Sequence, residues 1–220
     1  MDDILYRATI YVEILTAIVA SIYFYKYKNS QLKYFLIFLW YIVINEAIGK
    51  YYIDIVGEEK VFIYNIYVFI KFNFLLFIYW NFLSEKIHRK YAVAFSALFI
   101  IIYFIDVIYL ENFTTELMSY AFMTGSSFLM IVIFFYFIEI LNSEKVFDIT
   151  RDILFWISFG VLLFSLGIIP WLIVRKYFIQ LFIDNSSVLV ILFRCLLFIL
   201  NFCFIIGFIW GKKIQKQQQS

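Results

Sequence analysis

Apolar residues run along the chain in blocks of about 20, and short charged stretches separate each block from the next. At about 1.5 Å of rise per residue, a helix of this length matches the roughly 30 Å apolar thickness of a bilayer. The pattern therefore predicts an all-α, polytopic membrane protein. The predicted spans are residues 4–25, 34–53, 61–83, 91–110, 117–141, 153–174 and 187–210. We expect them to form a single domain over residues 1–210, a seven-transmembrane-helix bundle.

Small residues and one proline within the blocks indicate how the helices pack. Gly160 and Gly167 are seven residues apart and share one stripe of a helix, which suits close contact with a neighbour. Gly125 allows the same in the fifth span. Pro170 cannot donate to the carbonyl of Leu166, so the sequence predicts a kink or a break in the sixth span.

Composition supports the membrane assignment. Hydrophobic residues make up 65% of the chain, whereas soluble domains contain about 45–50%. Cys195 and Cys203 both fall in the last apolar block, so no extracellular disulfide is expected. The first residues, MDDILYR, lack the basic segment of a signal peptide, and the first span is expected to remain in the mature protein.

The distribution of Lys and Arg between loops predicts the orientation. One side collects Lys26, Lys28, Lys33, Lys86, Arg89, Lys90, Lys145, Arg151, Lys212, Lys213 and Lys216, whereas the other has Arg7, Lys60, Arg175 and Lys176. This excess places the N-terminus outside and the C-terminus in the cytoplasm, with residues 211–220 as a short basic tail. The predicted location is a cytoplasmic (inner) membrane.

Charged and amide side chains inside the spans are the candidate site. A charge within the bilayer costs about 3 kcal/mol or more, so it should face protein or a wet cavity. Lys71 lies near the middle of the third span, and Glu13, Glu46 and Arg194 fall at similar depths in the outer half. The predicted ligand or ion pocket comprises Glu13, Asn45, Glu46, Asn65, Lys71, Asn73, Arg194 and Asn201. The alternative is a buried ion-pair network that fixes helix register.

Residues around this pocket lead to more specific expectations. Lys71 should pair with Glu46, or failing that with Glu13. The seventh span should approach the first and second spans, which would bring Arg194 towards Glu13. Thr9, Glu13, Thr16 and Ala20 recur at helical spacing and form one polar or small face of the first span. Asp106 and Glu139 lie near span ends, where snorkelling or interfacial placement is the simplest interpretation.

The known templates of catalysis and metal binding are absent from the sequence. His88 is the single histidine and has no second His or Cys nearby, so no metal is expected. Ser126 and Ser127 have no obvious base, and phosphate-binding and dinucleotide motifs are missing. The last span has no lysine that could bind retinal. We expect no cofactor, no nucleic-acid partner and, on balance, no enzymatic activity.

Three functions remain open. The favoured hypothesis is a receptor-like membrane sensor, which binds a ligand in the charged pocket and signals through a separate cytoplasmic or membrane partner. The alternative is a small ion or solute transporter or channel that uses the same charges. The second alternative is a lipid-acting membrane enzyme with Glu46 and Asp106 as acid–base candidates.

Overall fold

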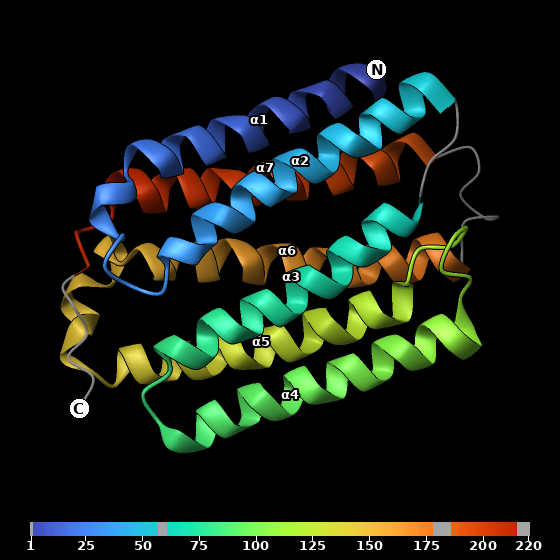
Figure 1. The fold of residues 1–220 in the computed structure, drawn as a ribbon. Coiled ribbons are helices and arrows are strands. Elements are labelled where there is room, and N and C mark those ends of the chain that lie inside the picture. Colours follow the sequence, from blue (N-terminus) through green and yellow to red (C-terminus); the bar gives the residue numbers. More distant parts are fainter. Residues whose placement is uncertain (1, 57–60, 178–185, 215–220) are drawn as a thin grey trace. The chain divides into compact units, whose positions relative to one another are not determined.

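The described part of the computed structural model covers residues 2–56, 61–177 and 186–214, and within these ranges the regular structure is helical, with no strand. The helices are α1 (Asp2–Ile22), α2 (Lys33–Val56), α3 (Val61–Phe82), α4 (Lys86–Ile105), α5 (Ser119–Leu141), α6 (Ile153–Tyr177) and α7 (Ser186–Trp210), as Figure 1 shows. Short 3₁₀ or π segments lie at η1 (Phe24–Lys26), η2 (Asp106–Leu110) and η3 (Glu144–Arg151). The predicted all-α class is confirmed.

Five helices among the described residues are long and apolar enough to cross a membrane. They cover Val61–Phe82, Lys86–Leu110, Ser119–Leu141, Ile153–Tyr177 and Val188–Trp210. The protein is therefore a multi-pass membrane protein by length and composition. The crossing of the membrane by α1 and α2 stays a prediction.

The chain forms two compact units, which we describe one at a time. Unit 1 comprises residues 1–43 and 144–220, and unit 2 comprises residues 44–143. The boundary between them falls inside α2. The predicted single domain over residues 1–210 stays a prediction.

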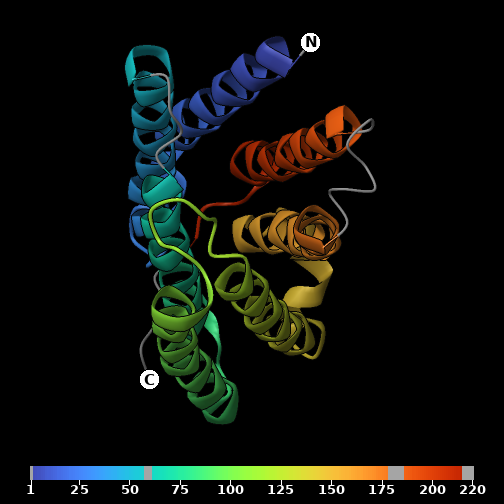
Figure 2. The ribbon, with the colours of Figure 1, turned by 90° about the vertical axis from the view of Figure 1, so that its right-hand side faces the viewer.

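In unit 2, α3, α4 and α5 pack on one another (Figure 2). Their contacts are largely aromatic and aliphatic: the ring of Phe72 lies edge-on to those of Phe99 and Phe122, at centroid distances of 5.4 and 5.2 Å. Gly125 makes room for Phe72, because a Cβ on this glycine would lie 2.6 Å from the ring. The close packing predicted at Gly125 is confirmed.

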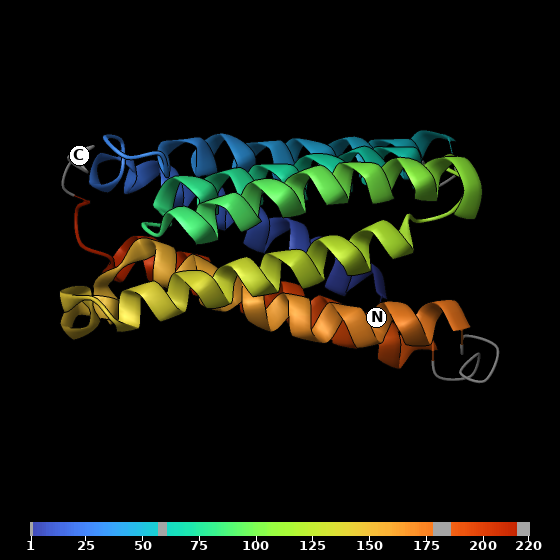
Figure 3. The same ribbon diagram turned by 90° about the horizontal axis from the view of Figure 1, so that it is seen from below.

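In unit 1, α6 and α7 lie side by side over much of their length, and α1 packs on α7 (Figures 1 and 3). A Cβ added to Gly160 would lie 2.8 Å from the Cβ of Cys203, and one added to Gly167 would lie 2.5 Å from Leu196. The stripe predicted from these two glycines is therefore confirmed as the contact face of α6 with α7.

The inward face of α1 is also as predicted. Its polar and small residues, Thr9, Glu13, Thr16 and Ala20, are all buried. The contact of α1 with α7 confirms that the last span approaches the first. Both results follow from helical periodicity, because residues three and four positions apart share a face.

Pro170 does not end its helix. α6 is a single α-helix from Ile153 to Tyr177 with Pro170 inside it, so the predicted break is wrong. A proline removes one hydrogen bond, to the carbonyl four residues earlier, and the remaining bonds of a long apolar helix can hold the segment together. A kink without a break stays a prediction.

Candidate functional site

The two units divide the residues of the predicted pocket between them. Unit 1 contains Glu13, Arg194 and Asn201, and unit 2 contains Asn45, Glu46, Asn65, Lys71 and Asn73. A pocket that combines all eight stays a prediction. The contacts within each unit show what several of these side chains do.

Lys71 is a buried cation in an aromatic environment. It is the eleventh of the 22 residues of α3, and only 7% of its surface is exposed. Its Nζ lies 5.7 Å from the ring centre of Tyr67, 5.5 Å from that of Phe72 and 4.9 Å from that of Phe122. Ring faces at these distances attract an ammonium group by cation–π interaction.

Asn65 fixes the connection between α4 and α5. Its Nδ2 donates to the carbonyls of Phe113 at 2.8 Å and Glu116 at 2.9 Å, while its Oδ1 accepts from the N–H of Met118 at 3.0 Å. The hydroxyl of Tyr103 donates to the Asn65 carbonyl at 2.9 Å. Both side-chain donors are therefore used, and the fully buried amide holds a loop in place.

Asn73 and Asn201 also make bonds to the protein. Asn73 accepts a 2.9 Å hydrogen bond from Ser96 on α4 and donates to the Phe69 carbonyl one turn back. Asn201, which is buried, donates to the Leu197 carbonyl at 2.9 Å. Such bonds satisfy an amide inside an apolar helix without a ligand.

Sequence reasoning missed the network that caps the N-terminus of α5. Asp106 Oδ2 accepts from the N–H of Ala121 at 2.8 Å, and Glu111 Oε2 accepts from the N–H of Ser119 at 2.5 Å. The first N–H groups of a helix have no partner within the helix and carry partial positive charge, so they attract carboxylates. Asp106 is fully buried. It therefore does not snorkel into water, and the expectation that it lies at the membrane interface stays a prediction.

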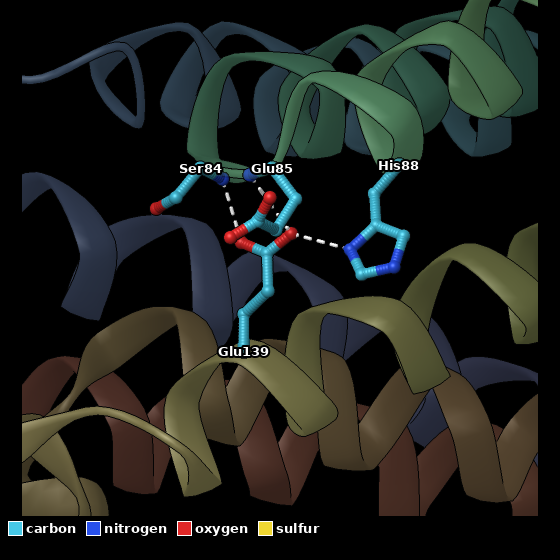
Figure 4. Close-up of polar contacts among 4 residues, drawn as sticks. All are labelled: Ser84, Glu85, His88 and Glu139. Atoms are coloured by element: carbon cyan, nitrogen blue, oxygen red, sulfur yellow. Dashed lines mark hydrogen bonds and ion pairs between the residues drawn. The ribbon is translucent and has the colours of Figure 1, made fainter.

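Glu139 makes the corresponding cap at the start of α4 (Figure 4). Its two oxygens accept from the N–H groups of Ser84 at 2.6 Å and Glu85 at 3.2 Å. Its Oε1 also lies 2.6 Å from Nδ1 of His88. The imidazole of His88 stacks on Phe135 with the ring centres 4.5 Å apart and nearly parallel planes.

The surroundings of this carboxylate–imidazole pair are those of a helix cap. Figure 4 shows the hydroxyl of Ser84 turned away from His88, so it does not provide a nucleophile for the imidazole. No group of three or more His, Cys, Asp or Glu that could hold a metal ion occurs among the described residues.

In unit 1, Lys26 caps the C-terminus of α7. Its Nζ donates to the carbonyls of Phe208 at 3.0 Å and Ile209 at 2.8 Å, where a cation also suits the helix dipole. Partial burial lowers the pKa of Lys26 from its usual value. Nearby, both carboxylate oxygens of Asp148 accept from Lys212 at 2.9 Å. This hydrogen bonding and the charge of Lys212 lower the pKa of Asp148.

Comparison with protein-family models, with curated proteins and with solved structures gave no match to this chain.

Proposed function

We propose that this protein is a membrane sensor that binds a small molecule carrying an anionic group at Lys71 and signals through a separate partner protein. In this proposal the chain has seven spans, its N-terminus outside and its C-terminus in the cytoplasm. The excess of Lys and Arg on one side supports the orientation.

The buried ammonium of Lys71 is the observation that carries the proposal. It lies about 15 Å along α3 from Val61 at 1.5 Å per residue, in the middle of an apolar helix. Placing a charge at this depth costs about 3 kcal/mol or more, and charged residues inside spans are most often functional. The surrounding rings attract a positively charged ammonium, and such an ammonium attracts an anionic group such as a carboxylate or phosphate.

Three acids of unit 2 have a different role. Asp106, Glu111 and Glu139 each bind backbone N–H groups at the start of a helix. They stabilise the framework of α3–α5, and the ligand proposal does not depend on them. Lys71 is in the same bundle but outside these caps.

A ligand screen with matched lysine variants tests the proposal. Purified protein in detergent is heated with a panel of small carboxylates and phosphate esters, and the unfolding midpoint is measured. We expect one or more compounds to raise the midpoint of the wild type and of Lys90→Gln, since Lys90 is exposed, but not that of Lys71→Gln. Equal stabilisation of both variants by every active compound would contradict binding at Lys71.

Flux measurements separate the sensor from a transporter. The active compounds are placed inside proteoliposomes, and their release is followed. If the protein is a sensor, the compounds should leave the proteoliposomes no faster than they leave liposomes that lack the protein. Release that requires the protein and disappears in Lys71→Gln would replace the sensor by a transporter.

Reporter fusions test the orientation separately. Fusions after Lys86 and after Lys213 are expected to report the cytoplasm, and a fusion after Glu58 the outside. A cytoplasmic reporter at Glu58 would overturn the proposed seven-span layout, whatever the ligand screen shows.

A further inference from the structure

One end of unit 1 gathers exposed basic residues from three parts of the chain. The N–H of Ile214 donates to the carbonyl of Lys26, and the N–H of Lys212 donates to that of Arg151, both at 2.8 Å. These bonds join the segment after α7 to η1 and to η3. The exposed cations brought together in this way are Lys28, Lys33, Arg151, Lys212 and Lys213. We call this region, together with Phe147, the basic end of unit 1.

Asp148 and Asp152, two acidic residues described at this end, offset part of this charge. Asp148 is exposed and is held by Lys212 at 2.9 Å. Lys28, Lys33, Arg151 and Lys213 leave an excess of positive charge at this end. Exposed cations in such a cluster attract an anionic surface.

Phe147 lies within the same end and is 92% exposed, the highest fraction among the large hydrophobic residues described as exposed. It directly precedes Asp148, whose bond to Lys212 holds η3 beside the segment after α7. Trp210, the last residue of α7, is 68% exposed and Tyr25 in η1 is 53% exposed. Aromatic side chains at the ends of spanning helices are typical of the bilayer interface.

We propose that the basic end of unit 1 binds the headgroups of anionic phospholipids and that Phe147 inserts at the boundary between headgroups and acyl chains. The phosphates satisfy the exposed cations, and the exposed ring leaves water for apolar surroundings. α7 itself is apolar enough to span the membrane, and a residue next to its end therefore lies near the headgroups. This inference does not depend on ligand binding at Lys71.

Lipid titration with two charge-matched variants tests the proposal. The full chain in mild detergent is titrated with phosphatidylglycerol or with phosphatidylcholine of the same acyl chains, and native mass spectrometry counts the bound lipids. One variant is Arg151→Gln with Lys213→Gln. The control is Lys86→Gln with Lys90→Gln, two exposed cations at the start of α4. Both variants lose two positive charges.

We expect the wild type to bind phosphatidylglycerol more tightly than phosphatidylcholine. The Arg151/Lys213 variant should bind phosphatidylglycerol at least tenfold more weakly, since each cation near an anionic lipid surface contributes about a fivefold factor. The control should lose less than threefold. Unchanged affinity in the first variant, or an equal loss in the control, would overturn the proposal.

A fluorescent label tests the position of Phe147 directly and is read on folded protein. The two native cysteines are first removed by Cys195→Ser and Cys203→Ala. A label is then attached at Phe147→Cys or, as a control, at Ser84→Cys, an exposed position. The labelled protein is placed in bilayers that contain phosphatidylglycerol. A label at position 147 should be quenched by spin-labelled lipid and shielded from iodide, and a label at position 84 should be quenched less by the lipid and more by iodide than the label at position 147. Quenching by iodide at position 147 would overturn the insertion of Phe147. Shielding from both quenchers, as expected for a bound protein, would also overturn it.

Discussion

The carboxylate of Glu139 on α5 accepts a 2.6 Å hydrogen bond from the backbone N–H of Ser84, just before α4. At the other end of the same pair of helices, Asp106 directly follows α4 and accepts from the N–H of Ala121 on α5. Each helix thus supplies the acid that caps the N-terminus of the other. This exchange explains why two acids lie at the ends of otherwise apolar helices.

Replacing Glu139 by Ala should destabilise unit 2. Two N–H groups at the start of α4 would lose their acceptor, and the expected loss is about 0.5–2 kcal/mol, the usual range for a helix cap. Glu139→Gln should cost less, because one amide oxygen can still accept. The measurement is the unfolding midpoint in detergent. Glu85→Gln is the control, since Glu85 makes no side-chain cap bond at this helix end, and an equal drop there would contradict the cap.

Asn65→Ala should cost about 3 kcal/mol or more, because a buried amide then leaves two carbonyls and one N–H without their partner. The same measurement of unfolding applies. Asn81→Ala on the same helix is the control: Asn81 donates only to the Phe77 carbonyl one turn back, and its loss should stay below about 1 kcal/mol. If Asn65→Ala kept its full stability, the amide would not be what holds the α4–α5 connection.

The two glycines of α6 should respond differently to Ala. At Gly160 the new Cβ meets the Cβ of Cys203 at 2.8 Å and the backbone carbonyl of Leu200 at 3.2 Å, and neither can rotate away. At Gly167 the new Cβ meets the methyl groups of Leu196, which can rotate away. Gly160→Ala should therefore cost about 1–3 kcal/mol and Gly167→Ala less. The measurement is the thermal unfolding midpoint of both variants. A larger loss of stability in Gly167→Ala than in Gly160→Ala would contradict the geometry.

The helices could be predicted closely because hydropathy falls wherever a charged loop begins. The third span was predicted over 61–83, and α3 covers Val61–Phe82. Charge was misleading at two helix ends. The fourth span was predicted to begin at residue 91, but α4 begins at Lys86, where Glu139 caps the start despite the basic residues of the first turn. The sixth continues through Arg175 and Lys176, because cations suit a helix C-terminus.

The roles of the polar residues were harder to predict. Asn65 stood out in the sequence as an amide in an apolar span, which also describes a ligand contact. Its partners lie 48 to 53 residues further along the chain. Periodicity shows which residues share a face, but it does not show which loop lies opposite that face. The same limit applies to Glu139, whose target N–H groups belong to another helix.

Acid should weaken the contact between η3 and the segment after α7. Lys212 lowers the pKa of Asp148 by hydrogen bonding and by charge, so the bond contributes stability above the unfolded pKa of about 3.9. That contribution is lost as the pH falls through the lower folded pKa. The midpoint difference between wild type and Asp148→Asn should therefore be small at pH 7 and vanish once the pH is below the lowered pKa of Asp148. It should also shrink in 1 M salt, because both side chains are exposed. A difference that grows on acidification would contradict this sign.

Glu46 and Lys71 are predicted to be energetically coupled, and the approach of α2 to α3 shows how. A Cβ on Gly49 would lie 2.8 Å from the Tyr64 hydroxyl, so the helices are close there. Figure 1 shows α2 and α3 running in opposite directions. Glu46 lies about 4.5 Å before Gly49 along α2, and Lys71 lies about 10 Å beyond Tyr64 along α3, at 1.5 Å per residue. Because the helices are antiparallel, Glu46 and Lys71 both lie on the side of the Gly49–Tyr64 contact away from the α2–α3 connection. Their positions along the helix axes differ by about 6 Å, a distance that a lysine side chain can span.

A double-mutant cycle measures this coupling. Lys71→Met alone should leave the charge of the Glu46 carboxylate uncompensated. Glu46→Gln alone should leave the charge of the Lys71 ammonium uncompensated. The double variant loses both charges together. The double variant should therefore be more stable than the sum of the single losses predicts, by about 1–3 kcal/mol. Lys71→Met combined with Glu116→Gln is the control, because Glu116 is exposed and its effect should add. If the losses of the Glu46 pair are additive within about 0.5 kcal/mol, Glu46 does not hold Lys71.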